Sequence, residues 1–199
     1  PTAASSSSET CAGRAPKPGL RLRAAAGRAA SDVAGLIAVT GEGRRENLVV
    51  CGPAGTGKSH TLIGLGIAAV EHGHRVRYFT AAELVETLYR GLADNSVGKL
   101  IDSLLRNDLV LVDELGFAPL DDTGAQLLFR FVAASYERRS LGIASHWPFE
   151  SWGRFLPEHT TAVSMLDRLL HHCHTVVTNG DSYRMRQART KGGTRLKTS

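Results

Sequence analysis

The sequence has no apolar run long enough to cross a membrane. A spanning helix needs about 20 predominantly apolar residues, and the longest candidate, Thr61 to Val70, is about half that length. We therefore expect no membrane span and no membrane partner. Cysteine is also scarce, and Cys11, Cys51 and Cys173 are widely separated and form no C-x-x-C pair. This usage is typical of a reducing compartment and not of a disulfide scaffold, so we expect a cytoplasmic protein.

The chain also lacks an even distribution of charge. Its net charge is +5, but residues 1–30 carry +4 and residues 184–199 carry +6, which leaves −5 for the middle. Two cationic ends suit contact with a polyanion such as DNA, because each Lys or Arg placed at a phosphate releases a counterion. Solubilising tails are the alternative. Residues 1–30, rich in Ser, Ala and Gly, are predicted to be a disordered basic tail, and residues 186–199 a flexible basic tail.

Residues 31–185 are predicted to form one α/β core. The length of 199 residues and the 42% hydrophobic content fit a single domain with a sizeable core. Thr80 to Glu83 has the spacing of a helix capping box. Strands alternate with helical segments, which predicts a parallel five-stranded sheet in three layers. The predicted strands are Leu48–Cys51, Val76–Phe79, Leu109–Val112, Leu141–Ser145 and one around Val176. One predicted helix begins at Lys58, and another spans Thr123–Tyr136.

A phosphate-binding loop is the clearest motif. Gly52 to Ser59 reads G-x-x-x-x-G-K-S and lies between a predicted strand and a predicted helix. The glycines let backbone N–H groups surround a polyphosphate, and the helix N-terminus adds its positive dipole end. Lys58 is expected to reach the β- and γ-phosphates, and the Ser59 hydroxyl to ligand Mg²⁺. The following helix carries apolar residues at Leu62, Ile63, Leu65, Ile67 and Val70, so we expect it to be buried.

A pair of acids follows the third predicted strand. Asp113 and Glu114 come directly after four apolar residues, so a buried strand delivers both to its carboxyl end, where ligands bind in open α/β sheets. Asp113 is predicted to hold the Mg²⁺ shell, and Glu114 to orient and deprotonate a water. A small-molecule kinase also uses the glycine loop but does not need this Glu, so an ATPase is favoured.

Five motifs occur in order along the chain: Thr80–Leu84, Asp113–Asp121, Tyr136–Arg139, Leu166–His172 and Gly180–Arg184. Together they resemble the IstB family of transposition helper ATPases, which are AAA+ proteins similar to DnaC-type helicase loaders. The resemblance covers roughly Ala34 to Thr190 and is far more specific than the glycine loop and acid pair alone.

The resemblance implies an ATPase that assembles as a homo-oligomer on duplex DNA without sequence preference and works with a cognate transposase. Arg168 matches the family's arginine finger, supplied to a neighbouring subunit, and Arg184 matches the second sensor arginine. A surface salt bridge is the alternative role for Arg168. A DnaC-type helicase loader shares the core and is the alternative within the class.

The predicted nucleotide-binding residues are Gly52, Pro53, Ala54, Gly55, Thr56, Gly57, Lys58, Ser59, His60 and Arg184. The predicted catalytic residues are Glu114, Lys58, Arg168 and His146. The predicted metal ligands are Ser59 and Asp113, and the expected cofactors are ATP and Mg²⁺.

Two features depart from the family pattern. His146 stands where the family has an Asn that senses the γ-phosphate. An imidazole still donates a hydrogen bond, and its titration near neutral pH predicts pH-dependent turnover. Only 51 residues precede Gly52, and the first 30 do not resemble the family's helical front region. A truncated helper, or a nucleotide-binding module without hydrolysis, is therefore a second hypothesis.

Two further clusters are interpreted as structural. The run His171-His172-Cys173-His174 has adjacent residues that cannot all converge on one tetrahedral zinc ion. The aromatic residues between Trp147 and Phe155 could stack on bases, but core or interface packing is favoured.

Overall fold

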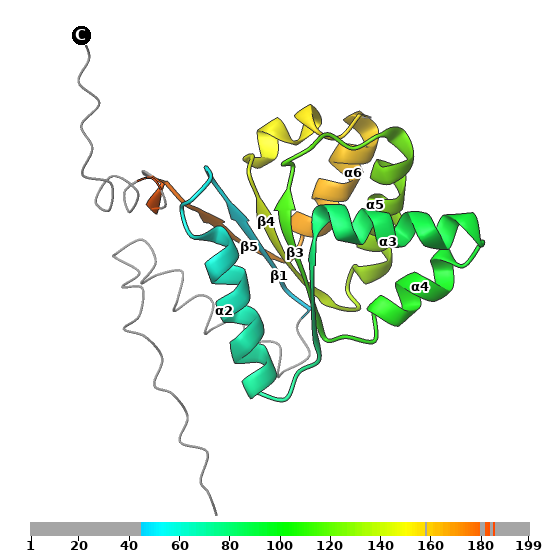
Figure 1. Ribbon diagram of the computed structural model, residues 1–199, viewed down its shortest axis with the longest axis horizontal. Helices are drawn as coiled ribbons and strands as arrows, with labels where there is room; N and C mark the ends of the chain where they lie inside the picture. Colours follow the sequence, from blue (N-terminus) through cyan, green and yellow to red (C-terminus); the bar gives the residue numbers. More distant parts are fainter. Residues whose placement is uncertain (1–44, 158, 180–181, 184, 186–199) are drawn as a thin grey trace, which may run out of the picture.

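The computed structural model describes residues 45–157, 159–179, 182–183 and 185 (Figure 1). Both predicted tails, residues 1–30 and 186–199, lie outside these described residues. Among the helices within them, none is long and apolar enough to cross a membrane. The elements in chain order are β1 (Asn47–Cys51), α2 (Lys58–Glu71), β2 (Val76–Thr80), α3 (Ala81–Ala93), α4 (Val97–Leu104), β3 (Leu109–Leu115), α5 (Asp122–Ser135), β4 (Ser140–Ser145), the 3-10 helix η1 (Phe149–Arg154), α6 (His159–Leu170) and β5 (Cys173–Val177).

The five strands form one parallel sheet in the order β2-β3-β4-β1-β5, which confirms the predicted sheet. Strands β1 and β3 are separated by β4, and all three have their carboxyl ends at the same edge. Cys51 of β1 is in register with Ser145 of β4, and Leu115 of β3 is in register with the same residue. The loops that follow these strands therefore meet at one edge of the sheet.

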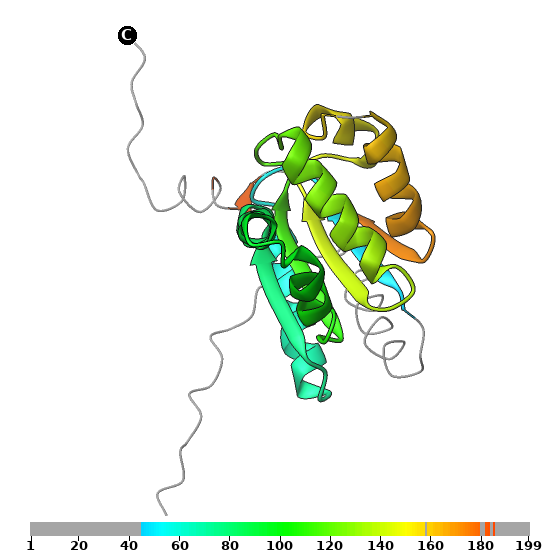
Figure 2. The same cartoon turned by 90° about the vertical axis from the view of Figure 1, so that its right-hand side faces the viewer.

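Side chains of the central strands alternate between two apolar layers, as the pleat of a strand requires. Val49, Val110 and Ile143 face a core shared with α3, α5 and α6. Leu48 and Leu111 face the opposite side, where α2 packs. Figure 1 shows α2 on one side of the sheet and α3, α5 and α6 on the other, and Figure 2 shows the face covered by α5 and α6 toward the viewer. The aromatic cluster belongs to the first layer, because Trp152 and Phe155 are buried there.

The expectation that α2 is buried at all its apolar positions is wrong for one face of the helix. Leu62 and Leu65 are buried against the sheet, whereas Ile63, Ile67 and Val70 are 46%, 56% and 57% exposed. A helix that lies on one face of a sheet buries a single stripe, and these three residues fall outside it.

Capping explains where α3 begins. The Thr80 Oγ1 accepts a hydrogen bond of 3.2 Å from the Glu83 N–H, and Glu83 Oε2 accepts one of 2.8 Å from the Thr80 N–H. The predicted capping box is confirmed, and it starts the helix directly after β2.

Candidate nucleotide-binding site

The glycine loop connects β1 to α2 and is folded on itself. Lys58 Nζ donates a hydrogen bond of 2.7 Å to the Pro53 carbonyl, and Thr56 Oγ1 donates one of 2.8 Å to the same oxygen. Helix α2 begins at Lys58 and has no acidic side chain in its first turn. Its uncapped backbone N–H groups and positive dipole end therefore favour an anion at the loop.

The segment that follows β5 presses against this loop. Thr178 Oγ1 lies 2.7 Å from Thr56 Oγ1, and the Tyr183 N–H donates a hydrogen bond of 3.0 Å to the Gly55 carbonyl. A Cβ at Gly52 would lie 2.2 Å from the Thr178 carbonyl oxygen, and Gly52 has a φ of +149°. Gly55 has a φ of +79°, and a Cβ there would lie 2.1 Å from Ser182 Oγ. Conformation and close approach together require glycine at both positions.

The two acids lie near the carboxyl end of β3, which continues one residue past them to Leu115, and they differ in their surroundings. Asp113 is only 3% exposed, whereas the Glu114 side chain is exposed to solvent. Glu114 has a φ of +60°, and the pairing of β3 with β4 shifts register between Val112 and Leu115. A left-handed conformation at a non-glycine residue costs free energy and is characteristic of functional sites. The bulge turns Glu114 outward while Asp113 stays in the sheet.

Both carboxylate oxygens of Asp113 are hydrogen-bonded. Oδ1 accepts a bond of 2.8 Å from the Glu114 N–H, and Oδ2 accepts a bond of 2.7 Å from the Tyr78 hydroxyl. Desolvation, followed by the hydrogen bond to Asp113, raises the pKa of Tyr78 above its ordinary value, so the phenol stays protonated as a donor. The orientation of Asp113 is therefore fixed from two directions.

The end of β4 connects the glycine loop to the acids. The Gly52 N–H donates a hydrogen bond of 3.2 Å to the Ser145 carbonyl, and the His146 N–H donates one of 3.1 Å to the Leu115 carbonyl. His146 is half-buried, with its ring edge-on to Trp147 at 5.1 Å between centroids. It therefore follows the strand that lies between the two motifs, where a sensor side chain is expected.

Arg168 lies away from this edge, because the carboxyl end of α6 leads into the opposite end of the sheet at the start of β5. Arg168 is half-buried on α6, where its Nη1 donates a hydrogen bond of 2.9 Å to the Ser164 carbonyl and its guanidinium lies 5.2 Å from the centroid of the Phe129 ring. Within the described residues it makes no salt bridge, so the alternative role as a surface ion pair gains no support. His60 is exposed on α2. Arg184 lies outside the described residues.

The family assignment follows from a family model described as IstB-like ATP binding protein, which matches residues 21–191. The chain belongs to the IstB-like ATP-binding protein family. It is 36% identical over 161 residues to the IS21 insertion-sequence ATP-binding protein of Pseudomonas aeruginosa, in an alignment that covers 81% of this chain and 60% of that protein. The IstB-like chain thus spans about 60% of the length of this curated relative.

Solved structures support the fold. The IstB-like chain is similar to DnaI with a TM-score of 0.70 and 15% identity, over 80% of this chain and 88% of that one. It is similar to the DnaC helicase loader with a TM-score of 0.60 and 18% identity, over 78% of this chain and 90% of that one. The fold is that of a P-loop AAA+ protein, as the sequence predicted.

Sequence reasoning missed three side chains of the IstB-like site: Tyr78, Thr178 and Ser182. Tyr78 lies opposite Leu111 in the β2–β3 pairing, which makes Asp113 its diagonal neighbour on the same face of the sheet. A tyrosine reaches that distance, so the strand pairing was the signal that could have identified it. Thr178 and Ser182 follow β5, and only the adjacency of β1 and β5 brings them to the loop.

Proposed function

We propose that this chain binds ATP with Mg²⁺ and hydrolyses it as the ATPase of an insertion-sequence transposition helper. One observation carries the proposal: a phosphate-type loop at the end of β1, a buried acid and an exposed acid at the end of β3 share one edge of a parallel sheet. That combination suits binding of a nucleoside triphosphate at the loop and attack by water on its terminal phosphate.

The residues present fit a magnesium ion. Ser59 is half-buried at the start of α2, and Asp113 is a buried carboxylate that Tyr78 and the Glu114 backbone hold in place. Magnesium prefers such oxygen donors together with phosphate oxygens and water. Ser59 and Asp113 would hold the ion, and its chemistry there would be to supply positive charge beside the β- and γ-phosphates.

Three side chains of the same subunit would bind the phosphates and activate the water. Lys58 would exchange its bond to the Pro53 carbonyl for the β- and γ-phosphate oxygens. Glu114, exposed and turned outward by the bulge, would accept a proton from a water in line with the bond to the leaving oxygen. His146 would donate a hydrogen bond to the γ-phosphate from the end of β4.

Arg168 would complete the site of a neighbouring copy. Within the described residues its guanidinium contacts the Ser164 carbonyl and the Phe129 ring, and solvent or a phosphate can replace these contacts at modest cost. A finger supplied in trans makes hydrolysis depend on assembly.

The family match supports transposition over replication as the setting, because the IS21 relative is encoded by an insertion sequence. The similarity to DnaC and DnaI is one of fold. The partners we propose are duplex DNA, contacted through its phosphates, a cognate transposase and further copies of the chain. We propose the cytoplasm as the place where they meet. The cationic ends of the sequence support the DNA contact.

The test is ATP hydrolysis per subunit as protein concentration rises, with and without nonspecific duplex DNA. The proposal expects specific activity to increase with concentration and with DNA. Bound ATP with no turnover under any of these conditions would contradict it and leave a nucleotide-binding module.

That nucleotide-binding module is the second candidate function, and His146 favours it because an imidazole replaces the family's sensor amide. A His146→Asn variant tests the sensor role. If His146 senses the γ-phosphate, the profile of hydrolysis rate against pH differs between the wild type and the variant. Identical profiles for both proteins would remove His146 from the mechanism.

A further inference from the structure

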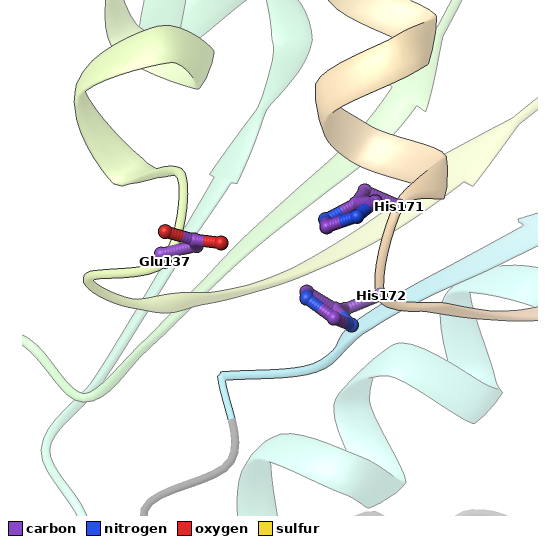
Figure 3. Close-up of side chains that lie close together, drawn as sticks. All are labelled: Glu137, His171 and His172. Carbon is purple, nitrogen blue, oxygen red and sulfur yellow. The ribbon is translucent and has the colours of Figure 1, made fainter.

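Three metal-type ligands gather at the end of the sheet opposite to the glycine loop. Glu137 precedes β4, and His171 and His172 precede β5 (Figure 3). One carboxylate oxygen of Glu137 and one ring nitrogen of each histidine all lie within 4.8 Å of one another. All three side chains are exposed, and they point toward one another from two loops far apart in sequence.

The loop that carries Glu137 is fixed by hydrogen bonds. The Arg138 and Arg139 N–H groups both donate bonds of 2.9 Å to the Ser135 carbonyl, and Arg139 Nε donates one of 2.7 Å to the Leu105 carbonyl. Glu137 itself has a φ of +54°. The turn therefore holds this carboxylate in a conformation that a non-glycine residue adopts at a cost.

The loop that carries the histidines is fixed through Asn47, which is 8% exposed. The Asn47 N–H donates a bond of 2.7 Å to the His172 carbonyl, and its Nδ2 donates one of 3.0 Å to the Leu169 carbonyl. Its Oδ1 accepts a bond of 2.9 Å from the Leu141 N–H of β4. One buried amide thus ties the end of α6 to the strand that follows Glu137.

Tyr136 orients one of the rings. Its hydroxyl lies 2.8 Å from His171 Nδ1. When Nδ1–H donates to the phenolic oxygen, the Nε2 lone pair of His171 is left for a metal ion. Ligating histidines usually make such an outer hydrogen bond, which fixes the tautomer and the ring plane.

We propose that Glu137, His171 and His172 form a binding site for one divalent transition-metal ion of the zinc type. Two imidazoles and one carboxylate suit zinc, cobalt or nickel better than magnesium, and water would fill the remaining positions. Metal–ligand bonds of about 2.0–2.2 Å place ligand atoms roughly 3.3 Å apart, so side-chain rotations have to close the present separation. The site would join the α5–β4 loop to the end of α6, the helix that carries Arg168.

The neighbouring histidine provides a matched control. His174 Nε2 lies 2.5 Å from Glu46 Oε2 and belongs to a separate pair. Cys173 Sγ lies 3.4 Å from the His174 carbonyl. The four-residue run therefore does not converge on one ion, as its spacing indicated, and the third ligand comes instead from Glu137, 34 positions before His171 in the sequence.

The experiment titrates the full chain, without a histidine tag and stripped with chelator, with zinc in excess Mg²⁺ by calorimetry. Cobalt is titrated in parallel, and its visible absorption reports coordination. We expect one ion per chain, at least tenfold weaker binding for His172→Gln and for Glu137→Gln, and unchanged binding for His174→Gln. Tyr136→Phe should weaken binding about tenfold as an orienting residue.

Thermal unfolding of each variant in chelator checks that it is folded, and zinc should raise the melting temperature of the wild type and of His174→Gln only. The proposal is wrong if the double variant His171→Gln/His172→Gln binds zinc as tightly as the wild type. It is also wrong if half an ion binds per chain, because the ion would then bridge two copies.

Discussion

The Tyr78 hydroxyl donates a hydrogen bond of 2.7 Å to Oδ2 of Asp113, and this contact joins two parallel strands at the proposed magnesium site. Asp113 Oδ1 is held separately by the Glu114 N–H. The carboxylate is therefore oriented before any ion arrives. An oriented ligand binds a metal ion at a lower entropic cost than one that must be ordered on binding.

Removing the Tyr78 hydroxyl should weaken magnesium binding more than nucleotide binding. For Tyr78→Phe we expect the Mg²⁺ concentration at half-maximal hydrolysis to rise about tenfold, with little change in ATP affinity measured without Mg²⁺. Because the pKa of Tyr78 is raised, the wild-type activity should show no loss that follows phenol ionisation up to pH 9. Equal Mg²⁺ dependence in both proteins would make Tyr78 a structural residue only.

Mixing two inactive variants tests whether Arg168 acts on a neighbour. Arg168→Ala keeps Glu114, and Glu114→Gln keeps Arg168, so a random mixed assembly rebuilds a complete site at about one interface in four. We expect about a quarter of the wild-type rate from an equimolar mixture, and almost none from either variant alone. A mixture as inactive as its components would indicate that Arg168 works within its own subunit or not at all.

Two thiols should be unreactive in the folded chain. Burial raises the pKa of Cys51 to about 11, and burial also raises the pKa of Cys173 to about 11. At pH 8 both are protonated, and the thiolate is the reactive form. Alkylation of these two residues, followed by peptide mass spectrometry, should accelerate strongly when the chain is unfolded. Modification of either at the same rate before and after unfolding would contradict the described packing.

The sequence predicted what local patterns encode. Neighbouring residues were enough to predict the strand, loop and helix around Gly52 to Ser59, the capping box at Thr80 and the five strands. Helices α4 and α6 and the 3-10 helix η1 were not predicted. Helix α4 and η1 are short and depend on packing against larger elements, whereas the 12-residue α6 was read only as a family motif around Leu166–His172. The bulge that extends β3 through Leu115 was missed for a related reason, since it arises from pairing with β4.

Contacts between distant residues could not be predicted. Tyr78 contacts Asp113 only because β2 pairs with β3. Ile63 and Ile67 are exposed because of the way α2 packs on the sheet, which local sequence does not determine. Glu137 and His171 come together because β4 and β5 flank β1. One sequence without an aligned set of relatives contains no direct record of such pairings.

The most direct test of the central claim compares ATP binding and ATP hydrolysis in the wild type and in Glu114→Gln, with Asp122→Asn, an exposed acid in the first turn of α5, as the control. We expect Glu114→Gln to bind ATP as the wild type does and to hydrolyse it at least a hundredfold more slowly, while Asp122→Asn is unchanged. A Glu114→Gln protein that hydrolyses ATP at the wild-type rate would contradict the assignment of Glu114 as the base.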